Sequence, residues 1–356
     1  MERLVFFGKG GIGKSTMSAN ISATLAATGR RVLHVGCDPK HDSTASLLDG
    51  RIIDPIVDRI DRLEGLRPDD VVTPSPYGVD CVEAGGPEAG VGCGGRGVSR
   101  MLEIFNAAGL LTPSRYDVCL YDVLGDVVCG GFASPLRRGV GEKVVIVASE
   151  EVMALYAANN IARAVVHYAD NGIALAGLVV NLRDNHEDRA PVERFAKLIN
   201  TRVLAYLPRD PLVREAEYRR MPVVAYAPGA PISRALRDLA DGLLSIDART
   251  LPLPTPLSET AFHAHTRYKF DAPPGGLGAL PPDAPPPGVV SLDRLRGAAQ
   301  RSDSGIAGAQ RAEYESELAA GRRAVRLGRV GAEEALRRLR AHFDEARALS
   351  VGDLVS

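Results

Sequence analysis

Near the start of the chain, Gly8–Ser15 has the sequence GKGGIGKS, which matches the pattern G-x-x-x-x-G-K-[ST]. It follows the apolar run Leu4–Phe7 and leads into a helical pattern that ends at Gly29. Glycines let the backbone N–H groups of such a loop close around polyphosphate oxygens, and the N-terminus of the next helix adds its positive end. We therefore expect a nucleotide-phosphate loop. Its backbone contacts would come from Gly8, Gly10, Gly11, Ile12 and Gly13.

Two side chains at the end of the loop extend this prediction. Lys14 would bridge the β- and γ-phosphates, and the Ser15 hydroxyl would ligate Mg²⁺. The alternative is a glycine-rich turn before an ordinary helix. The preceding strand pattern, the lysine and the serine together favour the phosphate loop.

Apolar strand-like runs alternate with helical patterns over roughly the first 245 residues. The strand candidates are Leu4–Phe7, Val32–Cys37, Val79–Glu83, Val118–Val123, Val144–Ala148, Ala176–Asn181 and Val203–Leu207. The helix candidates include Ser15–Thr28, Glu150–Asp170, Pro191–Ile199, Asp210–Met221 and Ile232–Ser245. Most strand candidates are continuous apolar runs, which is typical of a sheet covered on both faces. The alternation predicts an α/β fold of the P-loop NTPase kind, with a mostly parallel sheet and helices on both of its faces.

The composition changes after about residue 250. We expect a P-loop domain over 1–250, a Pro/Gly-rich linker over 251–288 and a C-terminal helical extension over 289–356. The extension has two apolar helical faces, which predict a helical hairpin that packs on the main domain or on a partner. A membrane-surface helix is the alternative, although the stripes are thin and rich in alanine. The first face carries Tyr314, Leu318, Gly321 and Val325, and the second carries Leu336, Leu339, Phe343 and Ala346.

Composition excludes several classes of protein. The formal net charge of the 356 residues is −1, so no global basic field favours nucleic acid. The sequence contains no run of about 18 apolar residues, so we expect no membrane-spanning helix. The N-terminal sequence lacks the features of a secretory signal peptide, so we expect a cytoplasmic protein. The five cysteines are an odd number in a large chain, which favours metal binding or burial over disulfides.

Acidic residues follow two of the predicted strands, where nucleotide-responsive segments are expected. Asp38 and Asp42 follow the strand that ends at Cys37, and the stretch with Asp122 and Asp126 lies at the end of the strand that starts at Val118. Carboxylates at the carboxyl ends of such strands face the ligand crevice, where they can hold Mg²⁺ or orient the attacking water. For any single Asp, a helix cap or a turn is the alternative.

Two of the cysteines stand apart from the other three. Cys93 and Cys129 are each followed by Gly-Gly, whereas Cys37, Cys81 and Cys119 lie within or beside apolar strand runs and are expected to be packing residues. Glycine next to a cysteine leaves backbone N–H groups free to approach the sulfides of an inorganic cluster. Since a [4Fe–4S] cluster takes four thiolates, two chains would have to share one cluster on a two-fold axis.

Residues 1 to about 250 resemble the nitrogenase iron protein and its relatives, the ATP-dependent reductase subunits of dark protochlorophyllide and chlorophyllide reductases. The loop has a second lysine, Lys9, and in this it resembles the loops of the wider class of deviant P-loop ATPases. In that class the corresponding lysine reaches the partner subunit's phosphates. The resemblance implies a homodimer with one MgATP per subunit and one bridging [4Fe–4S] cluster. The matching segments, in order, are GKGGIGKST, VGCDPKHDST, EAGGPEAGVGCGGRG, YDVLGDVVCGGFASP, YAANNIARAV and LPRDPLVREAEYRRM.

The same resemblance assigns roles to individual residues. It implies Cys93 and Cys129 as the cluster ligands and Arg96 as a docking residue beside the cluster. It implies a catalytic and switch set, namely Lys9, Lys14, Ser15, Thr16, Asp38, Lys40, Asp42, Asp122 and Asp126. It implies an adenine-binding set, namely Asn181, Pro208, Arg209, Asp210 and Glu217.

The function implied is ATP-driven, one-electron transfer from ferredoxin or flavodoxin to a separate catalytic protein. His41 and Val79–Ala84 resemble the protochlorophyllide branch, whereas Arg96, Tyr156–Asn160 and Pro208–Asp210 resemble the nitrogenase branch. This mixture favours a nitrogenase-like reductase, of which the methylthio-alkane type is our preferred interpretation. The alternatives are a nitrogenase or protochlorophyllide reductase iron protein, an iron–sulfur carrier, and, from another class, a partition-type ATPase switch.

Overall fold

The fold is taken from a computed structural model of the chain, which describes residues 1–38, 40–85, 95–125, 133–137, 139–185, 188–271, 318 and 333–336. For residues 95–96 and 267–271 it describes the backbone only. The chain divides into two compact units, Met1–Ala272 and Pro273–Ser356.

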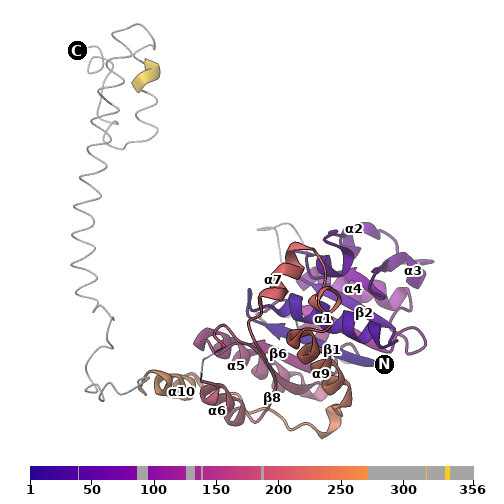
Figure 1. Cartoon of the computed structure of the whole chain (residues 1–356). Coiled ribbons are helices and arrows are strands. Elements are labelled where there is room, and N and C mark those ends of the chain that lie inside the picture. Colours follow the sequence, from indigo (N-terminus) through magenta and orange to yellow (C-terminus); the bar gives the residue numbers. More distant parts are fainter. Residues whose placement is uncertain are drawn as a thin grey trace. The chain divides into compact units, whose positions relative to one another are not determined.

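The first unit is built on a sheet with helices packed around it (Figure 1). In the described residues this sheet has eight strands in the order β3-β4-β2-β5-β1-β6-β7-β8. Only the short edge strand β3 runs antiparallel to its neighbour, and every other strand pairing in the sheet is parallel. This arrangement confirms the predicted α/β fold with a mostly parallel sheet. The strands are β1 (Glu2–Gly8), β2 (Val32–Cys37), β3 (Thr73–Pro74), β4 (Val79–Glu83), β5 (Val118–Val123), β6 (Lys143–Ala148), β7 (Ala174–Asn181) and β8 (Val203–Leu207).

The sheet is covered on both faces, because successive side chains of a strand point to opposite sides. In β1, Val5 and Phe7 belong to one apolar core, while Leu4 and Phe6 belong to the other. All residues of β2, β5 and β6 are buried. Continuous apolar runs were therefore the correct sequence signal for this sheet.

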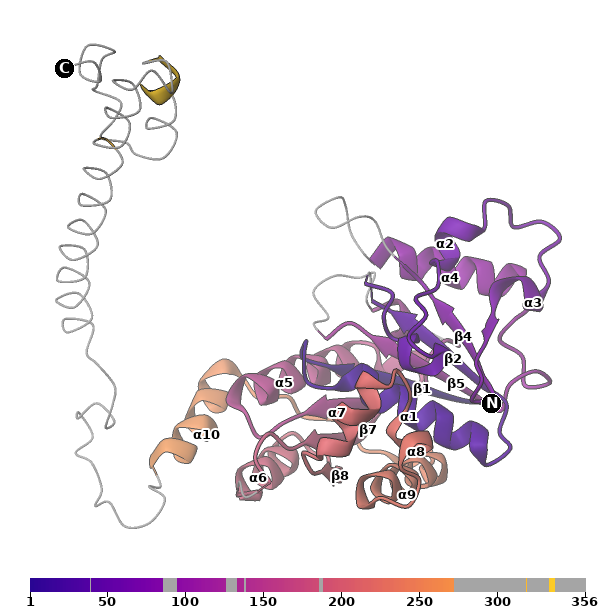
Figure 2. The same ribbon diagram turned by 45° about the horizontal axis from the view of Figure 1, so that its top comes forward.

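The helices divide between the two faces. Those that pack on the side of Leu4 and Phe6 are α1 (Lys14–Ala27), α7 (Pro211–Tyr218), α8 (Val223–Tyr226) and α9 (Pro231–Ser245). Those on the side of Val5 and Phe7 are α2 (Ile56–Arg59), α3 (Pro68–Val71), α4 (Gly95–Ala107), α5 (Val152–His167), α6 (Ala190–Leu198) and α10 (Glu259–Asp271). Figure 2 shows α1, α8 and α9 close together, and α10 beside α5 and α6. Short 3₁₀ turns occur at Ala45–Leu48, Ser134–Leu136, Ala169–Asn171 and Ala248–Thr250.

Two helices of 13 residues, α4 and α10, were not among the sequence candidates, and neither were the four-residue helices α2, α3 and α8. Helix α4 begins at Gly95, inside a glycine-rich stretch that hides its start. Helix α10 lies within the segment expected to be a linker, and its Phe262 is buried against Tyr156 and Phe195, with ring centroids 5.3 Å and 6.1 Å away. The first compact unit, Met1–Ala272, includes this helix.

In the second unit the described residues are 318 and 333–336. Residues 333–336 are helical, and Ala335 and Leu336 are buried. The remaining residues of the predicted hairpin lie outside the described part of the chain. Within the described residues, no helix combines the length and the apolar character needed to cross a membrane.

Candidate nucleotide and cluster site

The glycine-rich loop connects β1 to α1, as the sequence predicted. Gly13 has a φ of 92°, and a Cβ there would lie 2.5 Å from Nδ2 of Asn181. That amide nitrogen donates a hydrogen bond of 2.7 Å to the Ile12 carbonyl oxygen. Only glycine fits this position, because a side chain would be strained by the backbone and would displace Asn181. The loop is thus held by β7, from which Asn181 comes.

Lys14, the first residue of α1, forms a buried ion pair with Asp122 on β5. The Lys14 side chain is 8% exposed and that of Asp122 is fully buried. Burial alone would raise the pKa of Asp122, but the charge and hydrogen bond of Lys14 outweigh it and hold this pKa below its usual value. The Lys14 ammonium also lies 3.4 Å from the Ser15 hydroxyl oxygen. The structure therefore places a cation, a carboxylate and a hydroxyl where the sequence predicted phosphate and Mg²⁺ binding.

A chain of buried polar side chains extends from this pair and was missed by sequence reasoning. The other oxygen of Asp122 accepts a hydrogen bond from Ser43. His34 Nε2 lies 3.0 Å from the Ser43 hydroxyl oxygen, and His34 Nδ1 lies 2.8 Å from that of Ser22 on α1. Burial lowers the pKa of His34 to about 4, so this ring is neutral at pH 7. A histidine within the otherwise apolar run Val32–Cys37 was the available signal.

The predicted switch residues of segment 38–44 lie near these buried contacts: Asp38 is half-buried, and Lys40 and Asp42 are exposed. Lys40 donates its backbone N–H to Oδ1 of Asp38 at 3.0 Å. Asp42 and Ser43 line a cavity together with Ser15 and Thr16, so the structure brings the acidic segment to the hydroxyl end of the loop. Lys9 is half-buried and Lys40 is exposed.

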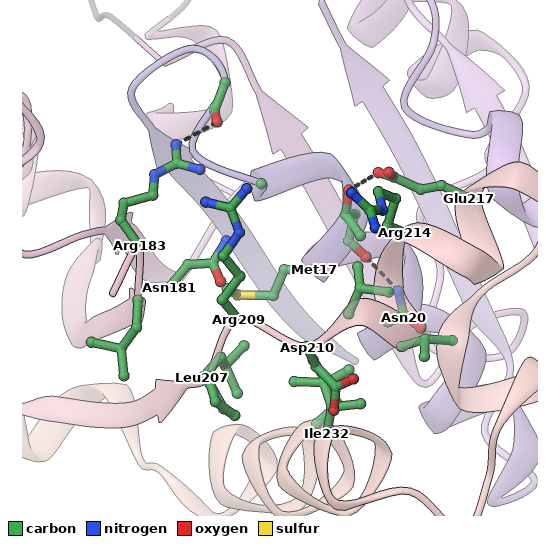
Figure 3. A pocket seen from close by; sticks show the side chains of 18 residues that line it. Met17, Asn20, Asn181, Arg183, Leu207, Arg209, Asp210, Arg214, Glu217 and Ile232 are labelled. Carbon is green, nitrogen blue, oxygen red and sulfur yellow. Dashed lines mark hydrogen bonds between the residues drawn. The ribbon is translucent and has the colours of Figure 1, made fainter. Parts of the chain in front are cut away.

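A second cavity, of about 310 Å³, lies beside the loop (Figure 3). Arg183 donates a hydrogen bond of 2.7 Å to the Gly11 carbonyl oxygen, and Thr16 donates one of 3.2 Å to Glu217. Arg183 and Arg214 also line it, and neither was identified from the sequence. The cavity brings the whole predicted adenine set to the loop, namely Asn181, Pro208, Arg209, Asp210 and Glu217.

Asp210 has a structural role that helps to place this set. Its carboxylate accepts a hydrogen bond of 2.9 Å from the backbone N–H of Leu212 and so caps the N-terminus of α7. Glu217, which accepts the hydrogen bond from Thr16, lies near the other end of that helix. The cap therefore helps to hold Glu217 in place at the cavity.

The three described cysteines are poor ligands for iron. Cys37, Cys81 and Cys119 are free and fully buried in the sheet, and burial raises the pKa of each thiol, to about 12 for Cys119. A metal ligand has to be the thiolate, which burial in apolar surroundings disfavours. Within the described residues, no group of His, Cys, Asp and Glu is arranged to hold a metal ion.

The predicted cluster residues fall elsewhere. Cys93, Cys129 and Asp126 lie outside the described residues, and Arg96 lies in the first turn of α4 without a described side chain. Cys93 and Cys129 therefore stay the predicted ligands, and two thiolates from each chain would be half of a four-thiolate site.

Gly125 shows how the nucleotide loop meets the segment that leads to Cys129. A Cβ on Gly125 would lie 2.0 Å from the carbonyl oxygen of Gly8 and 2.9 Å from the backbone nitrogen of Gly10. The backbone after β5 therefore packs directly against the loop. A shift of either segment toward the other would therefore meet backbone atoms.

Comparison with known proteins agrees with this geometry. Residues 2–268 match the family described as 4Fe-4S iron sulfur cluster binding proteins, NifH/frxC family. The nitrogenase iron protein of Methanospirillum hungatei JF-1 is 42% identical over 264 residues, covering 73% of this chain and 93% of that protein. The nitrogenase iron protein of Methanococcus voltae is 42% identical over 263 residues, with the same coverage of 73% and 93%.

Solved structures share the fold. The septum site-determining protein MinD of Pyrococcus horikoshii with Mg-ADP has a TM-score of 0.55 at 23% identity, covering 69% of this chain and 97% of that one. Cobyrinic acid a,c-diamide synthase of Mycobacterium smegmatis, with an ATP analogue and magnesium, has a TM-score of 0.52 at 21% identity, covering 72% and 100%. At these identities the likeness concerns the fold alone.

Proposed function

We propose a reaction for this chain from one premise: the chain belongs to the NifH/frxC family of 4Fe-4S iron–sulfur cluster binding proteins. Proteins of this family bind a [4Fe–4S] cluster and MgATP. Membership gives the chain an ATP-dependent electron-transfer role and implies a homodimer with a separate catalytic component.

The finer proposal is a methylthio-alkane reductase iron protein that takes electrons from ferredoxin or flavodoxin. Identity of 42% to nitrogenase iron proteins supports kinship with that branch, while His41 and Val79–Ala84 resemble another branch. Reductive cleavage of a methylthio-alkane uses two electrons and two protons, breaks the C–S bond and gives methanethiol and an alkane. Two one-electron deliveries to the catalytic component would supply it.

Different residues of the described site would contact different parts of the nucleotide. The loop backbone and Lys14 would hold the phosphates, Ser15 and Asp42 would face Mg²⁺, and the cavity lined by Asn181 and Glu217 would hold the adenine. Lys9 would reach the partner subunit's nucleotide, and Asp38 and Asp126 are our candidates for orienting the attacking water.

Cys93 and Cys129 of each chain would hold the cluster between two subunits, with Arg96 beside it on the docking surface. The cluster supplies a one-electron relay when bound. We place it there because the buried, high-pKa thiols of the sheet are unsuited to iron.

The observation that carries the proposal is the Lys14–Asp122 pair together with Gly125. Phosphate bound at the loop gives Lys14 a new anionic partner, which weakens its hold on Asp122. Asp122 and Gly125 belong to one short segment that continues to Asp126 and Cys129. Nucleotide exchange at the loop can therefore shift a cluster ligand through a few backbone bonds.

Anaerobic reconstitution with candidate catalytic components tests the proposal. We expect MgATP-dependent electron transfer, with methanethiol released from a methylthio-alkane. Transfer to a nitrogenase or protochlorophyllide component alone would favour those alternatives. A colourless protein that forms ATP-dependent assemblies would favour a partition-type ATPase.

A further inference from the structure

We propose that Glu83 is a positioning residue that ties the nucleotide-responsive segment 38–44 to the carboxyl end of β4, from which the chain continues to Cys93. This inference rests on the proposed function, because it assumes that MgATP acts on segment 38–44 and that Cys93 binds the cluster. It connects Cys93 to the nucleotide site by a path that is separate from the one that runs through Gly125 to Cys129.

The first contact of Glu83 is with the end of the segment. Glu83 is the last residue of β4, and its side chain is completely buried. Its Oε1 accepts a hydrogen bond of 2.7 Å from the backbone N–H of Thr44 and one of 2.8 Å from the Thr44 hydroxyl. Thr44 is itself fully buried, so water does not compete for these bonds.

The second contact is with the start of the segment. Glu83 pairs with Gly36 in the parallel register of β4 and β2, and the next backbone N–H, of Ala84, donates to the Gly36 carbonyl oxygen at 2.8 Å. A Cβ on Gly36 would lie 1.9 Å from Oε2 of Glu83. The carboxyl group therefore fills the space that a side chain at Gly36 would take. One side chain thus holds both ends of the segment that runs from β2 to Thr44.

Burial of the Glu83 carboxyl group costs folding free energy, which indicates that its role is not to stabilise the fold. Within the described residues, Oε2 of Glu83 has no hydrogen-bond partner and the carboxyl group has no ion-pair partner. Burial raises the pKa of Glu83 to about 8, the hydrogen bonds from Thr44 lower it, and the charges of Asp122 and Asp42 raise it further. A buried carboxyl group with an oxygen that has no hydrogen-bond partner stabilises the fold less than an apolar side chain of the same size would. We infer that its task is to transmit position.

The contacts form a continuous path from the phosphate loop. Lys14 pairs with Asp122, and Asp122 accepts a hydrogen bond from Ser43. Ser43 precedes Thr44, which holds Glu83 at the end of β4. A change of partner at Lys14 therefore moves Ser43 and Thr44, and through Glu83 the start of the segment that carries Cys93.

Hydrogen–deuterium exchange of the anaerobic holo-homodimer, with and without MgATP, tests this path. In the unaltered protein we expect MgATP to change exchange both in 38–44 and in 84–101. Glu83→Met fills the same volume without an acceptor, and Thr44→Val removes the hydroxyl donor while leaving Glu83 in place. In both variants the change in 38–44 should persist. The change in 84–101 should fall about fivefold in Thr44→Val, the factor that one ordinary hydrogen bond supplies, and further in Glu83→Met, which removes both bonds.

Glu83→Gln is the matched control, because its amide oxygen can accept both Thr44 bonds. It should keep the coupling of the unaltered protein. If Thr44→Val and a folded Glu83→Met both transmit the full change to 84–101, the inference is overturned. An unaltered protein that binds MgATP and iron, but whose MgATP response never reaches 84–101, would overturn the inference and leave the proposed function standing. A protein without iron or MgATP binding would overturn both.

Discussion

The ammonium group of Lys14 and the carboxylate of Asp122 form a buried ion pair that joins the glycine-rich loop to the central strand β5. The pair is the point at which the phosphate site, the buried polar chain through Ser43 and the segment after Gly125 meet. Replacement of either partner should therefore affect the fold and the nucleotide response together.

Asp122→Asn tests this pair. Removal of one partner of a buried pair leaves the other charge uncompensated and costs about 3–5 kcal/mol. We expect the free energy of unfolding to fall by about that amount without nucleotide, and MgATP to restore more of it than in the unaltered protein. Denaturant unfolding with and without MgATP measures both. Asp117→Asn, which breaks the exposed pair with Arg31, should have a much smaller effect and serves as the control.

His34→Gln should remove a pH dependence of stability. Burial lowers the pKa of His34 to about 4, and the unfolded value is 6.5. Since the unfolded chain takes up the proton first, this group's contribution is fully present above pH 6.5 and is lost as the pH falls toward 4. Between pH 7 and pH 5 the unaltered protein should lose about 2 kcal/mol more stability than the variant. Equal losses in denaturant titrations at the two pH values would contradict the neutral, buried imidazole.

Glu83→Gln should also remove a pH dependence of stability, of the opposite sign to that of His34. The pKa of Glu83 is raised to about 8 from 4.5, so the folded protein keeps a proton that the unfolded chain has released. Its penalty on stability is absent below pH 4.5 and grows as the pH rises to 8. From pH 6 to pH 8 the unaltered protein should lose about 2 kcal/mol relative to the variant. A variant whose relative stability does not rise with pH would show that the carboxyl group is ionised in the fold.

Gly125→Ala tests the close approach of the β5 segment to the loop. The added Cβ would meet the carbonyl oxygen of Gly8 at 2.0 Å, so one backbone has to move. Overpacking of this kind costs about 1–3 kcal/mol, and we expect MgATP affinity to fall about tenfold or more in equilibrium titration. Gly229→Ala, where a Cβ would meet nothing within 4 Å, is the control and should bind as the unaltered protein does.

Sequence reasoning predicted most of the sheet because the strands are buried on both faces and therefore appear as continuous apolar runs. It predicted the loop because the chemistry of phosphate binding is confined to Gly8–Ser15. Helix α10 was missed because its side chains lack a clear apolar face and its anchor, Phe262, finds its partners far away in the sequence.

The buried polar residues were missed for a related reason. His34 and Glu83 lie within strands, and nothing near them in the sequence shows that Ser22, Ser43 and Thr44 will bind them. Such partners become visible only when β2, β4 and α1 are assembled. The adenine set was found only through resemblance, since Asn181 and Glu217 are separated along the chain and meet at one cavity.

The central claim is that MgATP at the loop acts on a cluster shared by two chains through Cys93 and Cys129. Low-temperature electron paramagnetic resonance of the reduced, anaerobic homodimer, with and without MgATP, tests it most directly. We expect the signal of a one-electron-reduced [4Fe–4S] cluster that changes on addition of MgATP, that is retained in Cys37→Ser and is lost in Cys129→Ser. A homodimer without this signal, or one whose signal MgATP leaves unchanged, would contradict the claim.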